Sequence, residues 1–212
     1  MAYFDLEEQE QISAIKAWWR QYGRLVLGLA AAVVLSIAAV QGWRYYHDRQ
    51  AAQASELYHA LEQAVEKSDT AAAQESAARL MEQYPSTAYA SMAALLAARL
   101  SFEADDAKSA EARLRWVLER NRDPETTDFA RLRLAGLLLD QKRYPEALTL
   151  LEQKHGEAFA GRYADLKGDI LFAQGNVAEA RAAYRVALER IESNNPLRGL
   201  VEMKLDALGE AS

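Results

Sequence analysis

The chain has 212 residues, no cysteine and a formal net charge of −6, from 31 acidic and 25 basic side chains. A mildly acidic surface of mixed charge gives no electrostatic reason to expect nucleic-acid binding. Without cysteine, this sequence holds neither a disulfide framework nor a lipid-modified cysteine anchor.

Residues 1–24 are predicted to form a short amphipathic segment ahead of a membrane span. Ile12, Ile15, Trp19 and Tyr22 recur at helical spacing and make one apolar stripe. A helix of this kind lies along a membrane surface with its apolar face inserted among the headgroups. We therefore expect this segment to lie along the membrane surface on the side of the bilayer where the N-terminus is located.

Residues 25–43 are predicted to cross the membrane as a helix. The nineteen residues between Arg24 and Arg44 carry no charge, and nine of the sixteen from Leu25 to Val40 are Leu, Ile or Val. As a helix this stretch is about 28 Å long, close to the roughly 30 Å hydrocarbon core of a bilayer.

A cleaved signal peptide and a buried core helix are the competing interpretations of the same stretch. Ser36 and Ala38 imitate a small-residue cleavage site. The leader, however, is 24 residues long and contains four acids, unlike the short basic start of a signal peptide. Sixteen apolar residues without a polar face also differ from an ordinary core helix. An uncleaved anchor is the favoured interpretation.

Two further features belong to the span. Within it, Gly28, Ala32 and Ser36 recur at every fourth residue, a strip of small side chains that permits close packing on another membrane helix. On both sides it is flanked by aromatic residues, which favour the membrane–water interface. The predicted interface residues are Trp18, Trp19, Tyr22 and Trp43.

The basic residues give a weak preference for a cytoplasmic N-terminus. Lys16, Arg20 and Arg24 precede the span, whereas Arg44 and Arg49 follow it. Since cytoplasmic flanks carry an excess of Lys and Arg, residues 44–212 are expected outside the cytoplasm.

Residues 44–212 are predicted to form an all-α domain of paired helices. Good helix formers dominate, and no alternating β-branched run is present. From Ala164, the sequence ADLKGDILFAQGNVAEARAAYRVALE places small residues where two antiparallel helices approach closely, with Gly175 in the turn between them. Thirty-three residues earlier, Ala135 and Ala147 occupy the positions equivalent to Gly168 and Ala180.

That period and placement resemble the tetratricopeptide repeat, a helix–turn–helix unit of about 34 residues. The match weakens at Arg131, where the pattern has a large apolar residue, and at Lys154, where it has a small one. A third unit is laid over Ala97, Leu100, Ala112 and Trp116, and the first, within residues 58–84, has no unambiguous register. We expect a short α-solenoid of about four helix hairpins.

A C-terminal capping helix is predicted after Pro196. Solenoids need such a helix to cover their last apolar face. The apolar residues expected on its one inner face are Leu197, Leu200, Val201, Leu205 and Leu208.

The sequence offers no catalytic, metal-binding or cofactor-binding constellation. There is no Gly-rich phosphate loop and no HExxH motif, and His47, His59 and His155 lie far apart without ligand spacing. Asp165 and Asp169 share one helix face, where an acidic patch is favoured over a cation site. We therefore predict a protein that is not an enzyme and takes no metal or cofactor.

A partner-binding groove is the remaining candidate site. In tetratricopeptide repeats the first helix of each pair lines the concave surface, and apolar anchors with some charge suit a segment of another protein. A neighbouring helix of the same domain is an equal alternative occupant for the apolar members. The predicted groove residues are Phe129, Leu132, Gly136, Leu139, Arg162, Asp165, Asp169 and Phe172.

The whole chain resembles the YfgM family of Gram-negative bacteria, ancillary subunits of the SecYEG translocon. The resemblance is carried by EEQEQISAIKAWWRQYG, from Glu7 to Gly23, which leads directly into the span, and by the Ala-rich repeats that follow Trp43. It implies a single-pass protein of the cell inner membrane with a cytoplasmic N-terminus and a periplasmic domain over residues 44–212. It also implies as partners SecYEG, the PpiD-like periplasmic chaperone and emerging secretory proteins.

Two functions follow as hypotheses. The first is a non-enzymatic translocon accessory whose periplasmic domain binds partner proteins. The second is a membrane-tethered scaffold for envelope assembly, division or stress-response proteins, with the same fold but no role in secretion. Photocrosslinking from groove residues would separate them by the partners captured.

Overall fold

The computed structural model describes residues 3–121 and 123–209, and within these ranges every regular element is helical. The elements are α1 (Tyr3–Glu66), α2 (Thr70–Gln83), α3 (Ala88–Glu103), α4 (Ala107–Arg120), α5 (Pro124–Asp140), α6 (Tyr144–Leu151), the 3₁₀-helix η1 (Glu157–Phe159), α7 (Ala160–Ala173), α8 (Val177–Arg190) and α9 (Pro196–Ala207). This confirms the all-α fold predicted from the sequence.

The chain divides into two compact units, Met1–Gln50 and Ala51–Ser212. The first unit consists of the N-terminal part of α1. Among the described residues, this is the one helix long and apolar enough to cross a membrane, and none of its apolar window is buried. Leu25, Leu29 and Leu35 are each about 70% exposed. An apolar helix without a covering layer is what a bilayer-spanning segment requires.

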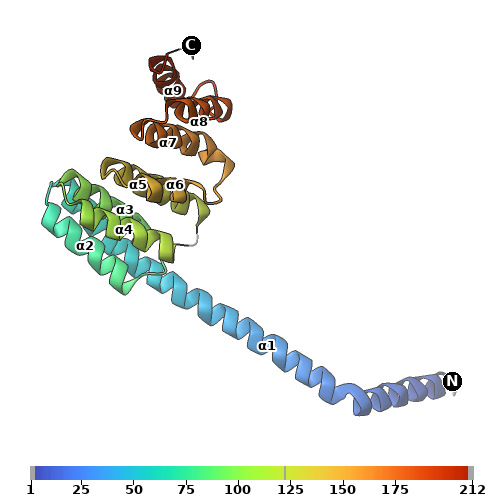
Figure 1. Ribbon diagram of the computed structural model, residues 1–212. Helices are drawn as coiled ribbons and strands as arrows, with labels where there is room; N and C mark the ends of the chain where they lie inside the picture. Colours follow the sequence, from blue (N-terminus) through green and yellow to red (C-terminus); the bar gives the residue numbers. More distant parts are fainter. Residues whose placement is uncertain (1–2, 122, 210–212) are drawn as a thin grey trace. The chain divides into compact units, whose positions relative to one another are not determined.

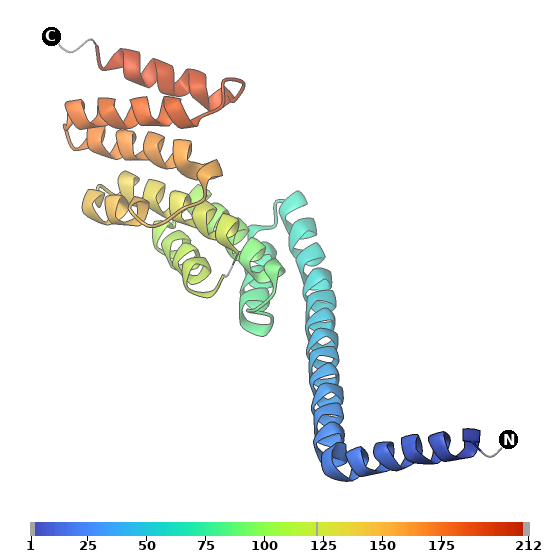
Figure 2. The same cartoon turned by 90° about the vertical axis from the view of Figure 1, so that its right-hand side faces the viewer.

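The second unit is a stack of helix hairpins. Figure 1 shows α2 to α9 following one another in chain order, and Figure 2 shows α7, α8 and α9 stacked as successive layers. Each of these helices packs on its neighbour in the sequence, and α5 also packs on α7. The end of α1 pairs with α2, since Leu61 of α1 and Leu80 of α2 are fully buried in one cluster. This gives four hairpins, α1–α2, α3–α4, α5–α6 and α7–α8, as the repeat pattern predicts.

One turn type joins the two helices of every hairpin. Each turn contains a single residue in the left-handed region, Ser68, Asp105, Lys142 or Gly175, with φ between 57° and 85°. The amide of the third residue after the first helix then donates to the carbonyl five residues back, for example Asn176 N–H to Leu171 C=O at 2.9 Å. Bonds of this kind satisfy carbonyls that a helix C-terminus leaves without partners.

Capping residues and prolines fix where the helices begin. The side chains of Asp69, Thr87, Asp106 and Asp123 accept hydrogen bonds from amides in the first turns of α2, α3, α4 and α5. Proline occupies the first turn of α5, α6 and α9, where its missing N–H costs nothing. These three prolines therefore mark helix starts and do not interrupt a helix, and the start of α9 at Pro196 agrees with the capping helix predicted there.

The core is built largely from alanine, which lets neighbouring helices approach closely. In one cluster Ala94, Ala130, Ala135 and Ala147 are all fully buried together with Leu134 and Leu138. Between α7 and α8, Gly168 packs directly against the Tyr184 ring, and an added Cβ there would lie 2.6 Å from Cδ1 of Tyr184. Small residues therefore set the spacing of the hairpins, as the pattern from Ala164 onward indicates.

Helix α9 covers the end of the stack. Val201 is fully buried against α8, and Leu197, Leu205 and Leu208 pack on the same cluster. The prediction for Leu200 is wrong, because its side chain is 44% exposed. At about 100° per residue, Leu200 lies at the edge of the stripe formed by the other four, so it turns away from the core.

Candidate partner-binding groove

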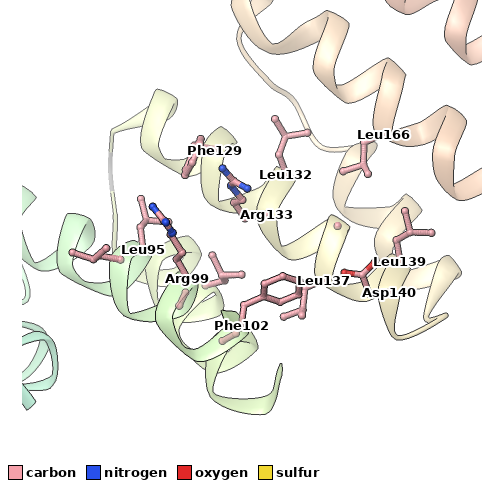
Figure 3. Close-up of a pocket in the computed structure, with 15 residues that line it drawn as sticks. Leu95, Arg99, Phe102, Phe129, Leu132, Arg133, Leu137, Leu139, Asp140 and Leu166 are labelled. Carbon is pink, nitrogen blue, oxygen red and sulfur yellow. The ribbon is translucent and has the colours of Figure 1, made fainter. Parts of the chain in front are cut away.

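An apolar groove of about 560 Å³ opens in the second unit between α3 and α5. Two residues of α4 and one of α7 complete its walls (Figure 3). The volume lies within the range of ligand-binding clefts. The apolar lining residues are Leu95, Leu96, Ala98, Phe102, Ala110, Leu114, Phe129, Leu132, Gly136, Leu137, Leu139 and Leu166.

Helical spacing explains which side chains reach the groove. On α3, Leu95, Arg99 and Phe102 stand at i, i+4 and i+7, so they share one face. On α5, Phe129, Arg133 and Gly136 follow the same spacing. Gly136 adds no side chain, and nothing lies within 4 Å of where its Cβ would be. The glycine therefore keeps part of the groove open.

Three charged side chains line the groove. Arg99 forms an ion pair with Glu103 at 2.7 Å on the exposed surface of α3. The Arg133 guanidinium lies over the Phe129 ring, 4.9 Å from its centroid. Figure 3 shows both guanidinium groups toward one end of the groove and Asp140 toward the other. The groove is thus apolar within and carries charge of opposite sign at its two ends.

The structure brings together four of the eight predicted groove residues. Phe129, Leu132, Gly136 and Leu139 all line this one groove. The sequence pattern missed the α3 side of it, including Leu95 and Phe102. A signal was present, because Leu95, Arg99 and Phe102 form a helical stripe, but the groove positions were assigned only on the last two repeats.

The four predicted residues on α7 lie elsewhere. Asp165 and Asp169 each form an ion pair with Lys204 of α9 at 2.8 Å, and the Tyr184 hydroxyl donates to Asp169, also at 2.8 Å. Arg162 lines a separate polar hollow beside Glu189 and Glu192. Phe172 is 53% exposed near the end of α7. The two aspartates therefore hold the capping helix.

Burial perturbs the ionisation of this ion-pair cluster. Burial raises the pKa of Asp165 above its usual value, although Lys204 opposes the shift. Burial opposes the charge on Lys204 as well, but the hydrogen bonds to the two aspartates outweigh it, so the pKa of Lys204 is raised. Burial and the neighbouring carboxylates also raise the pKa of the Tyr184 hydroxyl. The charged lysine is thus stabilised between two carboxylates.

The predicted membrane residues lie in the first unit and are largely exposed. Trp18, Trp19, Tyr22 and Trp43 are 40–68% exposed, so their rings are available to an interface. The Ile15 side chain of the predicted amphipathic stripe lies outside the described residues. In the small-residue strip, the space beside Gly28 is open, and the Ser36 hydroxyl donates to the Ala32 carbonyl at 2.8 Å.

The histidines have separate surroundings. His47 lies beside Trp43 with ring centroids 4.6 Å apart, His59 lies 3.2 Å from Glu62, and His155 stacks at 4.2 Å on Tyr163. Over residues 3–121 and 123–209, no group of three or more His, Asp or Glu side chains is arranged to hold a metal ion.

Comparisons with known proteins cover nearly the whole chain. The family model of a tetratricopeptide repeat-like domain matches residues 16–210. A protein of Neisseria gonorrhoeae named ancillary SecYEG translocon subunit is 33% identical over 207 residues, 96% of this chain and 98% of that protein. Proteins with the same name from Haemophilus influenzae and Escherichia coli K12 are 32% and 28% identical, covering 98% and 95% of this chain and 100% and 96% of their own lengths.

Proposed function

The chain belongs to the family of ancillary SecYEG translocon subunits with a tetratricopeptide repeat-like domain, and we propose that it serves as a non-enzymatic accessory of the translocon in the bacterial inner membrane. The observation that carries the proposal is similarity over nearly the full length. The match extends through the membrane segment and the repeats together, so it is not a likeness of repeats alone.

The proposed topology is a single pass. Residues 1–24 lie in the cytoplasm, residues 25–43 cross the membrane, and residues 44–212 form a periplasmic domain. The uncovered apolar helix of the first unit and its exposed tryptophans support this arrangement. The basic residues before the span support its direction.

The groove between α3 and α5 is the proposed contact with partner proteins. An open apolar groove on a rigid helical stack suits a segment of another protein, with side chains of that segment as anchors. We propose the PpiD-like chaperone and emerging secretory proteins as the partners. Because the anchor holds the domain on the same membrane as the translocon, even weak binding is raised by a high effective concentration.

The anchor helix also has a proposed contact. Because Ser36 donates to its own helix, the strip of Gly28, Ala32 and Ser36 acts through small size rather than through a hydrogen bond to a neighbour. Small residues of this kind allow two membrane helices to approach closely. A membrane helix of the translocon or of the chaperone is the proposed neighbour.

Site-specific photocrosslinking in intact cells tests the partner proposal. A photoreactive phenylalanine analogue placed at Phe102 or Phe129 should capture secretory chains and the chaperone. The matched control is Val186 on α8, which is 46% exposed and outside the groove. Capture of envelope or division proteins alone from the groove positions would contradict the translocon role.

A reporter enzyme fused after Ser212 tests the topology. A reporter that is active only in the periplasm should be active, and one that is active only in the cytoplasm should not. The reverse result would place residues 44–212 in the cytoplasm and remove the periplasmic partners from the proposal.

A further inference from the structure

The charges at the groove indicate which kind of segment it holds, an inference that rests on the proposed partner-binding role. The lining carries two guanidinium groups, Arg99 and Arg133, against one carboxylate, Asp140. Asp140 follows Arg133 by seven residues on the same helix, about two turns away. One end of the groove is therefore basic, while the interior is apolar.

Arg133 lacks a carboxylate partner among the described residues. The ion pairs of these residues do not include it, and its recorded contact is the ring of Phe129 at 4.9 Å. A guanidinium that rests on an aromatic face keeps its N–H donors directed outward in a planar fork. That fork matches the two oxygens of a carboxylate.

Arg99 on α3, the facing helix, is also available to pair with a carboxylate of a bound segment. Its ion pair with Glu103 is exposed on both sides, with side chains 72% and 51% accessible. An exposed pair of this kind contributes at most about 1 kcal/mol, so an incoming carboxylate competes with it at little cost. Two guanidinium groups from α3 and α5 thus lie at one end of an apolar surface that includes Phe102 and Phe129 (Figure 3).

We infer that the groove selects a protein segment that carries an acidic side chain directly beside its apolar anchors, and that Arg133, assisted by Arg99, recognises that acid. The apolar anchors fill the walls formed by leucine and phenylalanine. The carboxylate pairs with the guanidinium next to Phe129, where the aromatic ring excludes part of the water that would otherwise screen the pair. A segment with a basic residue at that place is repelled, which is a source of specificity.

The test uses the full-length chain in lipid nanodiscs and three labelled peptides. The peptides share leucine and phenylalanine anchors and differ only in the flanking residue, which is Glu, Gln or Lys. Fluorescence anisotropy should show tighter binding of the Glu peptide than of the Gln peptide by about fivefold at low salt, and a smaller preference at high salt.

Two variants and a control distinguish recognition of the acidic side chain by Arg133 from a general effect of the protein's charge. Arg133→Gln should remove the preference for Glu, and Arg133→Glu should reverse it toward the Lys peptide. Arg120→Gln is the matched control, because Arg120 also lies over an aromatic ring, that of Trp116 at 5.7 Å, but outside the groove. This control should keep the full preference. Circular dichroism of each variant verifies that the helical fold is retained.

The outcomes distinguish this inference from the function it rests on. Equal binding of the Glu and Gln peptides, or equal losses in the Arg133 and Arg120 variants, overturns the inference but leaves a partner-binding groove. Binding of none of the peptides contradicts the groove's role as well. Self-association of the chain that is lost in Arg133→Gln, without peptide binding, would show that a second copy occupies the groove and would also overturn the inference.

Discussion

At the residue scale, a buried polar network explains the departure from the repeat pattern at Arg131. Asp128 is 3% exposed and accepts hydrogen bonds from the Arg131 guanidinium at 2.6 Å, from the Tyr163 hydroxyl at 3.1 Å and from the Gly156 amide at 2.8 Å. Burial raises the pKa of the Tyr163 hydroxyl to about 12, so it stays protonated as a donor.

Arg131 also donates to the Lys154 carbonyl at 3.4 Å. Arg131, where the tetratricopeptide pattern has a large apolar residue, therefore belongs to a polar junction between α5 and the loop before α7. Because every member of the junction is hydrogen-bonded, it replaces apolar packing without leaving a buried charge unpaired.

The close contact of α7 with α8 makes Gly168 sensitive to a single methyl group. In Gly168→Ala the new Cβ would lie 2.6 Å from Cδ1 and 2.9 Å from Cζ of the buried Tyr184 ring. We expect a loss of about 1–3 kcal/mol in the free energy of unfolding, measured by denaturant titration followed by circular dichroism.

Gly199→Ala in α9 is the control for that substitution. Nothing lies within 4 Å of its added Cβ, so the higher helix propensity of alanine should stabilise the protein by up to about 1 kcal/mol. Equal effects of the two substitutions would show that the α7–α8 contact is looser than described.

Replacement of Lys204 should destabilise the protein by an amount that depends on pH. In Lys204→Met the partly buried Asp165 and Asp169 lose their shared cation, which we expect to cost about 2 kcal/mol at pH 7, discounted from the 3–5 kcal/mol of a fully buried pair. The pKa of Asp165, already raised by burial, then rises further in the folded state.

Because the pKa of Asp165 in the folded variant lies above its unfolded value, the folded state binds more protons at this group. The contribution of Asp165 to the stability of the variant therefore increases as the pH falls toward about 4. The deficit of the variant in melting temperature should therefore be largest at pH 7 and shrink toward pH 4. A deficit that is independent of pH would show that packing of the lysine stem, and not its charge, holds α9.

At the scale of elements, the four hairpin turns differ in how well their residues suit the backbone. Gly175 takes its positive φ at no steric cost, whereas Ser68, Asp105 and Lys142 carry a side chain there. Lys142→Gly should therefore stabilise the α5–α6 hairpin by about 1 kcal/mol.

The control for this turn is an exposed lysine in ordinary helical backbone. Lys167→Gly in the interior of α7 should destabilise the chain by about 1 kcal/mol. Melting temperatures of the two variants should move in opposite directions. Destabilisation by both would indicate that the Lys142 side chain makes a contribution that outweighs its backbone strain.

The sequence was sufficient for the elements that depend on local patterns. The last hairpin followed from Gly168, Gly175 and Ala180, and the start of the capping helix followed from Pro196. The groove residues on α5 followed from the rule that the first helix of each repeat lines the concave surface. Side-chain partners distant in the chain did not follow, because Lys204 reaches Asp165 across 39 residues and only the fold brings them together. The pattern therefore placed Asp165 in the groove, whereas it holds the capping helix.

At the scale of the whole molecule, two kinds of surface serve two kinds of contact. The first unit presents an uncovered apolar helix with small and aromatic residues, suited to lipid and membrane helices. The second unit presents a rigid stack with one apolar groove that is basic at one end, suited to a protein segment. The family of ancillary translocon subunits to which the chain belongs is not a family of enzymes.

The measurement that tests the central claim most directly is the recovery of SecYEG with this chain from its own membranes. An affinity-tagged full-length chain, extracted in mild detergent, should co-isolate SecYEG well above the level found with an unrelated single-pass protein. Replacing Gly28, Ala32 and Ser36 with leucine should reduce that recovery if the strip forms the contact. Recovery of SecYEG by the wild-type chain at only the level of the unrelated protein would contradict the account.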